Sequence, residues 1–344
     1  MRPTWWSARD VYEHPEQIWN PASRADPRDR VLAFHPVHTE AEEDCYVAEL
    51  ARGKVIDDAT LVATARNNVL GNLQVLYGYE NPREHPYPRR RRFRFSRSVR
   101  GTVSLLAASN GDNYYHWLFD SLPRLRLLEL AGTRLNAIDG FVLNLSHPSF
   151  QIQSLRHFGI PFTQLLYPSR LAILQPDRLI VPSMPGSPGS PPKWVCDWLR
   201  EKFLPRSRPH PNRKIYISRR RAQGRRICNE SEIEPLLARH GYEIIDAEHL
   251  SFDEQVSLFS SAASVIAPHG AGLSNLVWCH PGTTVLELQS PAHAERCFQV
   301  VAEHGGLRYA AAMLEPAPGD TFHNRFTDLV ADPQTLARAL DTLT

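Results

Sequence analysis

Several features that mark particular classes of protein are scarce or missing in this sequence. Cysteine occurs five times in 344 residues, at positions that are far apart and form no C-x-x-C pair: Cys45, Cys196, Cys228, Cys279 and Cys297. An odd number of scattered cysteines predicts neither a disulfide framework nor a zinc ribbon. We therefore expect the chain to work in a reducing compartment.

Long apolar runs are also missing. No stretch approaches the ~18 apolar residues of a membrane-spanning helix, and the first ten residues contain no apolar core of a signal peptide. We expect a cytoplasmic protein, with peripheral association with a membrane as an open alternative.

Lysine is rare as well, since only four of the 39 basic residues are lysine. The formal net charge of +2 conceals two arginine-rich segments, residues 89–100 and 213–226. In the first, Phe93 and Phe95 interrupt the arginines. This segment is either a solvated basic strand edge or a contact with an anionic membrane lipid or acidic glycan. We expect no nucleic-acid partner, because no other motif supports one.

The overall composition is that of an ordinary globular protein, with 42% hydrophobic and 22% charged residues. The chain exceeds the size at which a single core usually stops growing, which predicts two domains. We expect an N-terminal domain over residues 1–185, in which 1–98 has weak patterning and 99–185 is α/β. A second domain covers residues 186–325. A C-terminal helix over 326–344, beginning at Asp332-Pro333, is expected to pack back on the first domain.

The second half alternates strands with helices of about ten residues, which favours a parallel, doubly wound sheet. Strands are expected over residues 214–218, 242–246, 265–267 and 283–288. Capping boxes at Asn229 with Glu232, and at Ser251 with Glu254, predict the starts of two helices. Ligands of such sheets bind at the carboxyl ends of the strands. Three loops are therefore expected to converge there: residues 219–229, 247–251 and 269–272.

The last of these loops has the composition of an anion-binding turn. Gly270 and Gly272 allow a ligand to approach the backbone, and a helix predicted through Trp278 directs its first N–H groups towards that ligand. The first loop contains Arg219, Arg225 and Arg226, whose guanidinium groups can bind a diphosphate through paired hydrogen bonds. A solvated charge run is the alternative interpretation of these arginines.

In the first half, a strand over residues 103–108 precedes a helix for which Asp112 is the expected N-cap. Asn113, His116 and Asp120 fall at i, i+3 and i+7 and share one face of this helix. The spacing allows His116 and Asp120 to form a hydrogen bond, which would orient the imidazole as a base. Pro123 should kink or restart the helix. A polar cap containing a satisfied core histidine is the alternative.

Taken together, these segments resemble glycosyltransferase family 61, also known as capsular polysaccharide biosynthesis proteins. The resemblance rests on Asn113-Tyr-Tyr-His-Trp-Leu-Phe-Asp-Ser-Leu-Pro-Arg-Leu and on the motifs between Ile217 and Glu287 that include His269-Gly-Ala-Gly-Leu-Ser-Asn275. It implies a GT-B fold, with two Rossmann-like domains and an interdomain cleft. It further implies inverting transfer of a sugar from a nucleotide-sugar, usually UDP-linked, to a glycan, glycolipid or other hydroxyl acceptor in bacterial polysaccharide biosynthesis.

The resemblance also implies that no metal or other cofactor takes part, and the sequence has no Asp-x-Asp motif. The donor-binding residues would then be Arg219, Arg225, Arg226, His269, Gly270, Ala271, Gly272, Leu273, Asn275 and Glu287. Glu287 suits ribose or sugar hydroxyls. Asn275 binds either the nucleotide or the local backbone, and His269 either touches the diphosphate or orders the turn.

The catalytic residues would be His116, Asp120 and Asn113 on the helix of the first, acceptor-side domain. His116 oriented by Asp120 is the first choice of base, and Asp120 acting directly is the second. The alternative function is a non-catalytic module that binds a nucleotide-sugar or a glycan.

Overall fold

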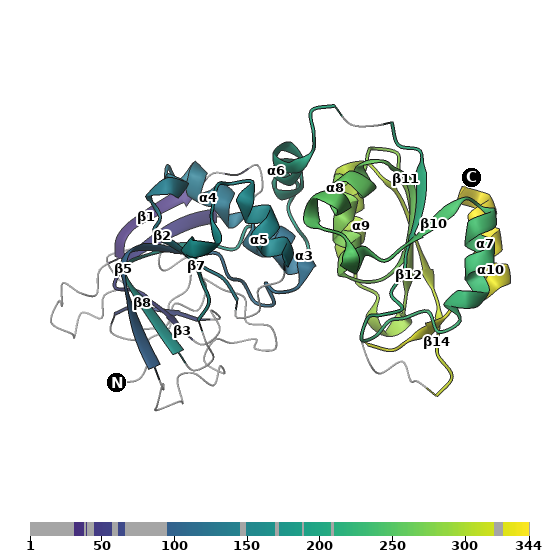
Figure 1. Ribbon diagram of the computed structural model, residues 1–344, viewed down its shortest axis with the longest axis horizontal. Helices are drawn as coiled ribbons and strands as arrows, with labels where there is room; N and C mark the ends of the chain where they lie inside the picture. The colour runs from purple at the N-terminus through teal and green to yellow at the C-terminus, as the bar shows by residue number, and fades with distance from the viewer. Residues whose placement is uncertain are drawn as a thin grey trace. The chain divides into compact units, whose positions relative to one another are not determined.

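The computed structural model describes residues 31–37, 39, 45–56, 61–65, 95–144, 149–168, 172–187, 189–207, 210–319 and 326–343. They form a mixed α/β protein with two compact units, Met1–Trp198 and Leu199–Thr344 (Figure 1). The division falls within helix α6 (Lys193–Phe203), just beyond the segment rich in proline and glycine. Within the basic segment 89–100, residues 89–94 lie outside the described residues, so the proposed membrane contact stays a prediction.

Unit 1 is built on a mixed sheet, which contains eight strands among the described residues. The strand order is β1-β2-β8-β5-β6-β7, and a β3–β4 hairpin is attached to β8. Strands β5, β6, β7 and β8 are parallel, whereas β2 runs antiparallel to β8. The strands are β1 (Val31–Val37), β2 (Cys45–Ala51), β3 (Lys54–Ile56), β4 (Leu61–Ala63), β5 (Phe95–Leu105), β6 (Gly140–Val142), β7 (Leu165–Leu166) and β8 (Ala172–Pro182).

Short helical segments follow these strands: α3 (Tyr114–His116), η4 (Trp117–Ser121), α4 (Arg124–Leu130), η5 (Leu135–Ala137), α5 (Ser149–Arg156) and η6 (Phe162–Gln164). The expected helix after β5 is therefore interrupted. Its centre, η4, is a π-helical turn in which the Leu122 N–H donates to the Trp117 carbonyl. A new helix starts after Pro123, which confirms the predicted break. The prediction of Asp112 as N-cap is wrong, because Asn113 occupies that position and its Oδ1 accepts from the Tyr115 N–H at 2.9 Å.

The core of unit 1 is formed by apolar side chains of β2, β5 and β8, together with residues just beyond these strands. Several of them are completely buried, namely Val103, Leu105, Ala107, Leu179 and Val181. The carboxyl end of β5, in this buried centre of the sheet, leads into the segment that carries His116 and Asp120.

Unit 2 confirms the predicted doubly wound parallel sheet. Its five strands have the order β10-β9-β11-β12-β13, and all four neighbouring pairs are parallel. The strands are β9 (Arg213–Ile217), β10 (Tyr242–Ile245), β11 (Ala262–Pro268), β12 (Thr284–Gln289) and β13 (Arg308–Met313). The chain proceeds from β9 to β10 on one side and then returns to β11 on the other side. The strand order therefore reverses between β9 and β11, which is where such sheets bind ligands.

Helices cover both faces of this sheet, with α7 and α10 on one face and α8 and α9 on the other (Figure 1). The helical segments are α7 (Glu230–Arg239), η7 (Ala247–His249), α8 (Phe252–Ser260), η8 (Ala271–Trp278), η9 (Pro291–His293), α9 (Cys297–Gly305) and α10 (Pro333–Leu343). A small antiparallel pair, β14 (Glu315–Pro316) and β15 (Leu329–Val330), completes the unit. None of the helices in the described ranges is long and apolar enough to cross a membrane.

The apolar face of helix α10, with Leu336 and Leu340, belongs to the core of unit 2 beside α7. The expected packing of this helix on the first domain stays a prediction. The capping box at Ser251 is confirmed, whereas the one at Asn229 is wrong. The Asn229 side chain instead exchanges hydrogen bonds with the backbone of Ala331, at 2.8 and 3.0 Å.

Candidate functional site

The loops that follow β9 and β11 meet at the reversal of strand order, through Arg219 and Gly270. A Cβ atom added to Gly270 would lie only 2.0 Å from Nη1 of Arg219. The φ angle of Gly270, 168°, belongs to extended backbone that any residue adopts. Glycine is therefore needed here for space, because it allows the guanidinium group to lie directly against the backbone.

Arg219 is a half-buried cation that is paired with no acid among the described residues. Its Nη2 donates to the Gly224 carbonyl at 3.0 Å, while its buried Nε has no hydrogen-bond partner among the described residues. No carboxylate in the described ranges lies within ion-pair distance of it. Burial, with a further contribution from the charge of Arg225, lowers the pKa of Arg219 to about 10. Since a desolvated charge is costly without a counter-charge, this position favours binding of an anion.

The start of η8 adds backbone donors next to Arg219. The Leu273 N–H, which the sequence assigns to the diphosphate, instead donates to the Gly270 carbonyl at 2.9 Å. The donors that precede the first intrahelical bond are those of Ala271 and Gly272. The predicted turn thus presents two backbone N–H groups and the guanidinium group of Arg219 within one short stretch.

The two other arginines predicted to bind the donor, Arg225 and Arg226, differ in their contacts. Arg226 binds Asp328 through both its guanidinium group and its backbone N–H, with Nε to Oδ2 and N to Oδ1 distances of 2.9 Å. Arg225 adopts a φ angle of 57° and donates its backbone N–H to Phe326 at 3.2 Å. The segment around 326–329 therefore fixes this half of the loop, and Asp328 neutralises Arg226.

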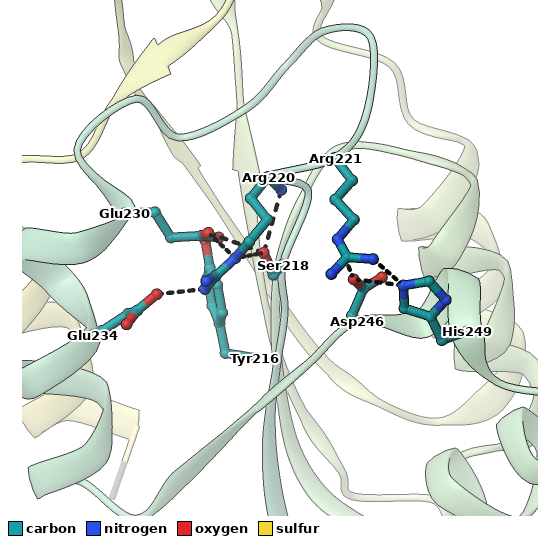
Figure 2. A network of polar contacts seen from close by, with 8 residues as sticks. All are labelled: Tyr216, Ser218, Arg220, Arg221, Glu230, Glu234, Asp246 and His249. Carbon is teal, nitrogen blue, oxygen red and sulfur yellow. Dashed lines mark hydrogen bonds and ion pairs between the residues drawn. The ribbon is translucent and has the colours of Figure 1, made fainter.

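Two further arginines in the loop are neutralised by acids that flank it (Figure 2). The buried Glu230 accepts from Tyr216 at 2.8 Å and Ser218 at 2.9 Å, and it forms an ion pair with Arg220 at 3.0 Å. Arg221 turns towards Asp246, 3.3 Å away, and contacts His249 (Figure 2). The sequence analysis did not recognise this role of Glu230, although the residue directly follows the predicted cap, Asn229.

Glu287 and His269 form a buried pair at the ends of β12 and β11. The Glu287 side chain is completely buried; its Oε1 lies 2.5 Å from Nδ1 of His269, and its Oε2 accepts from Tyr309. Burial, followed by the charge of Glu287, raises the pKa of Tyr309. The contacts present therefore order the turn around His269. Contact of Glu287 with sugar or ribose hydroxyls stays a prediction.

Asn275 is completely buried in η8 and bound locally. Its Nδ2 donates to Gln255 at 2.7 Å and to the Gly272 carbonyl at 3.1 Å, and its Oδ1 accepts from Trp278 at 2.9 Å. Of its two suggested roles, local binding is the one that accounts for these contacts. Asn275 fixes the helix that follows the glycine turn.

In unit 1, the structure confirms the predicted hydrogen bond between His116 and Asp120. The Nδ1 to Oδ2 distance is 2.6 Å, and the side chains are 18% and 6% exposed, respectively. Asn113 caps the helix start and is exposed there, and its catalytic role stays a prediction. Arg124, four residues after Asp120, is completely buried. The sequence analysis assigned it no role. Within the described residues, no group of three or more His, Cys, Asp or Glu side chains has an arrangement suited to a metal ion.

A doubly wound sheet with an unneutralised arginine and a glycine-lined helix start at its switch point is the arrangement of α/β proteins that bind phosphorylated ligands. The family profile described as Glycosyltransferase 61 matches residues 114–286, about half of the chain. The chain therefore belongs to glycosyltransferase family 61, and the matched range includes both His116 and the glycine turn.

The chain is similar to three characterised proteins over about a third of its length. It is 29% identical over 118 residues to the beta-1,2-xylosyltransferase of Arabidopsis thaliana, covering 30% of this chain and 22% of that protein. The beta-1,2-xylosyltransferase RCN11 of Oryza sativa subsp. japonica is 30% identical over 129 residues, which cover 34% of this chain and 23% of that protein. The EGF domain-specific O-linked N-acetylglucosamine transferase of Drosophila melanogaster is 28% identical over 114 residues, which cover 32% of this chain and 22% of that protein. The alignments span less than a quarter of each relative.

Proposed function

We propose that the protein is an inverting, metal-independent glycosyltransferase that moves a sugar from a UDP-linked donor to a hydroxyl of a glycan or glycolipid. The observation that carries the proposal is the half-buried cation of Arg219, which lies on the glycine turn and has no acid paired with it in the described residues. Family membership supports the class of reaction. We further propose that the enzyme acts in the cytoplasm and uses nucleotide-sugars there as its donor substrates.

The donor half of the reaction would use unit 2. The diphosphate accepts hydrogen bonds from Arg219 and from the first N–H groups of η8, and Arg225 adds positive charge nearby. These cations and dipoles stabilise the negative charge that develops on the leaving diphosphate, a task that a metal ion performs in other transferases. Arg226 contributes less, because Asp328 already neutralises it.

The acceptor half would use the pair His116 and Asp120. Because Nδ1 of His116 is bound to Asp120, the acceptor's proton would pass to the other ring nitrogen, Nε2. The acceptor oxygen attacks the anomeric carbon, its proton passes to Nε2, and the bond from the anomeric carbon to the diphosphate breaks with its electron pair on the diphosphate. Asp120 is the more buried of the two, which favours His116 as the base. Such a base contributes roughly 10²- to 10⁴-fold in rate.

The GT-B arrangement belongs to the same proposal. In that fold the acceptor-side and donor-side domains face each other across a cleft, so that the base and the diphosphate site act on one substrate pair. The parallel strands in the mixed sheet of unit 1 and the parallel sheet of unit 2 are compatible with this arrangement. Small-angle scattering with and without UDP would test it, because closure around a bound nucleotide reduces the radius of gyration.

Calorimetry and a transfer assay test the proposed reaction. Binding of UDP in preference to GDP and CMP is expected. The donor panel should start with UDP-xylose and UDP-N-acetylglucosamine, because the named relatives transfer xylose and N-acetylglucosamine. Inversion is read from the anomeric configuration of the product by NMR. Nucleotide binding without turnover on any acceptor would instead indicate the non-catalytic binding module.

Two variants and a chelator test the assigned roles. His116→Ala and Asp120→Asn should each lower the transfer rate at least about 100-fold while UDP affinity stays unchanged. Folded variants with wild-type rates would overturn the assignment of the base. A strong loss of activity in EDTA that Mg²⁺ or Mn²⁺ restores would overturn the metal-independent mechanism.

A further inference from the structure

A short turn, residues 290–296, follows β12 at the carboxyl edge of the sheet in unit 2. Its backbone is fixed by bonds within the turn. Ser290 caps η9 with its side chain, and its carbonyl accepts from the His293 N–H at 2.9 Å. Nε2 of Gln289 donates to the Glu295 carbonyl at 3.0 Å. The turn therefore fixes the position of the His293 backbone without any ligand.

His293 packs against His269, the residue that precedes the glycine turn. The two imidazole rings meet edge to face, with centroids 5.1 Å apart and 89° between their planes. Phe298 packs on the same ring of His269, also at 5.1 Å. Since Arg219 lies against Gly270, the next residue along the chain, groups from the ends of β9, β11 and β12 lie in a row at one edge of the sheet.

Of the two histidines, His293 is the more accessible to a ligand. Its side chain is 22% exposed, compared with 7% for His269. Nδ1 of His269 is bound to Glu287, whose carboxylate also accepts from Tyr309. The polar atoms of this buried group are thus used to hold one another, whereas His293 keeps part of its ring at the surface.

The order of the strands indicates which part of a donor would meet His293. Neighbouring strands lie about 4.8 Å apart, and β11 lies between β9 and β12, parallel to both. In the proposed function, the diphosphate occupies the ends of β9 and β11, next to Arg219 and the first N–H groups of η8. The end of β12 is one strand further along. A ligand group at that position is therefore one attached to the diphosphate, and in a nucleotide-sugar both such groups are sugar rings.

We infer that His293 is a further donor-binding residue, which forms a hydrogen bond with a hydroxyl of a sugar ring attached to the diphosphate. This inference rests on the proposed role of unit 2 as the donor site. The ring is either the ribose or the transferred sugar, which share this chemistry. An imidazole nitrogen can bond to a hydroxyl, because a hydroxyl both donates and accepts. Glu287 is less suited to the task, since it is completely buried and both its oxygens already accept hydrogen bonds.

Three variants separate this hydrogen bond from the packing of the ring. His293→Phe keeps an aromatic ring against His269 but has no polar atom, whereas His293→Gln keeps polar atoms without the ring. His210→Ala is the control, because it removes an exposed histidine that precedes β9 at the opposite edge of the sheet. Circular dichroism checks that each variant is folded. Should His293→Phe fail to fold, His293→Ala takes its place with the same expectation.

Isothermal titration with inorganic diphosphate, UDP, UDP-xylose and UDP-N-acetylglucosamine separates the parts of the donor. Loss of one hydrogen bond predicts roughly 3- to 10-fold weaker binding of a sugar-containing probe by His293→Phe. His293→Gln should lose less, and His210→Ala should match wild type. Inorganic diphosphate should bind all variants as it binds wild type. A loss that is already complete with UDP assigns the contact to the ribose, and a loss that appears only with a UDP-sugar assigns it to the transferred sugar.

Three results would overturn the inference. The first is wild-type affinity of folded His293→Phe for all four probes. The second is an equal loss for inorganic diphosphate and the nucleotides, because the residue then acts on the phosphates. The third is a loss in His293→Gln without one in His293→Phe, because packing then accounts for it. Transfer of sugar by wild type in any of these cases leaves the proposed function standing. If the expected pattern of binding is found but no sugar is transferred, the inference stands and the proposed function fails.

Discussion

The close contact between Gly270 and Arg219 in the proposed donor site gives the most specific prediction. In Gly270→Ala the new Cβ would lie 2.0 Å from Nη1 and 2.7 Å from Cζ of Arg219. Carbon atoms pack at about 3.5–4.0 Å, so the guanidinium group has to move by ~1.5 Å or more. Because φ at this position is 168°, alanine fits the backbone itself. The substitution therefore displaces the arginine rather than the chain.

This displacement has two consequences. Loss of the bond from the charged Arg219 guanidinium to the Gly224 carbonyl costs about 1.5–3 kcal/mol, and the entropy that alanine removes from the unfolded chain offsets about 0.4–1 kcal/mol of it. The free energy of unfolding should thus decrease by about 0.5–2.6 kcal/mol. Loss of one charge-assisted bond to a diphosphate costs about 1.5–3 kcal/mol. This corresponds to roughly 10- to 100-fold weaker binding.

Isothermal titration with UDP measures the affinity, and urea unfolding measures the stability. Gly272→Ala, two residues away, is the comparison variant, because its Cβ would meet only Cγ2 of Ile217, at an ordinary 3.5 Å, and so leaves Arg219 in place. We expect Gly272→Ala to weaken UDP binding less than Gly270→Ala does. Wild-type affinity in folded Gly270→Ala would refute the placement of Arg219 in the donor site. Equal losses in both variants would refute the steric argument.

Three further predictions concern the scaffold of unit 2. Burial acts to raise the pKa of Asp328, but the hydrogen bonds and charge of Arg226, with the charge of Arg219, lower it overall. The extra stability of wild type over Asp328→Asn should therefore be present above a pH of about 4 and be lost as the pH falls through the lowered pKa of folded Asp328. Urea midpoints of both proteins at pH 7 and near pH 2 would show this loss. Asn275→Ala leaves Trp278 Nε1 and Gln255 Oε1 without this partner and should cost about 2–4 kcal/mol in urea unfolding; a cost below about 1 kcal/mol would mean that the buried bonds rearrange. Ser251→Ala removes the cap of α8 and should cost about 0.5–2 kcal/mol, whereas an unchanged thermal midpoint would show that Glu254 caps the helix alone.

The doubly wound sheet of unit 2 was predictable because its signals are local. Apolar strands alternate with capped helices, and the hydrophobic pattern of about ten residues indicates whether each segment is a strand or a helix. The His116–Asp120 bond was predictable for the same reason, since four residues along a helix place two side chains side by side. The π-helical turn at this place was not predictable, because no pattern in the sequence distinguishes the bond from the Leu122 N–H to the Trp117 carbonyl from an ordinary α-helical bond.

The roles of the individual arginines depended on partners far away in sequence. Arg226 appeared as well suited to a diphosphate as Arg219, but its partner Asp328 lies 102 residues further along the chain. The same distance separates Asn229 from Ala331, whose backbone binds the side chain that was expected to cap α7. Pairing over such a separation follows from how the chain packs, and no local pattern encodes it.

The sequence by itself determined the fold class of unit 2, the glycine turn and the His116–Asp120 pair, because hydrophobic periodicity and helical spacing act over short stretches of chain. Only the tertiary structure decided which arginine remains unneutralised. Folding brings Asp328, Glu230 and Asp246 to three of the arginines in the loop, and it places Arg219 against Gly270 with no acid paired to it in the described residues. Charge neutralisation depends on distances in space, and the fold sets those distances.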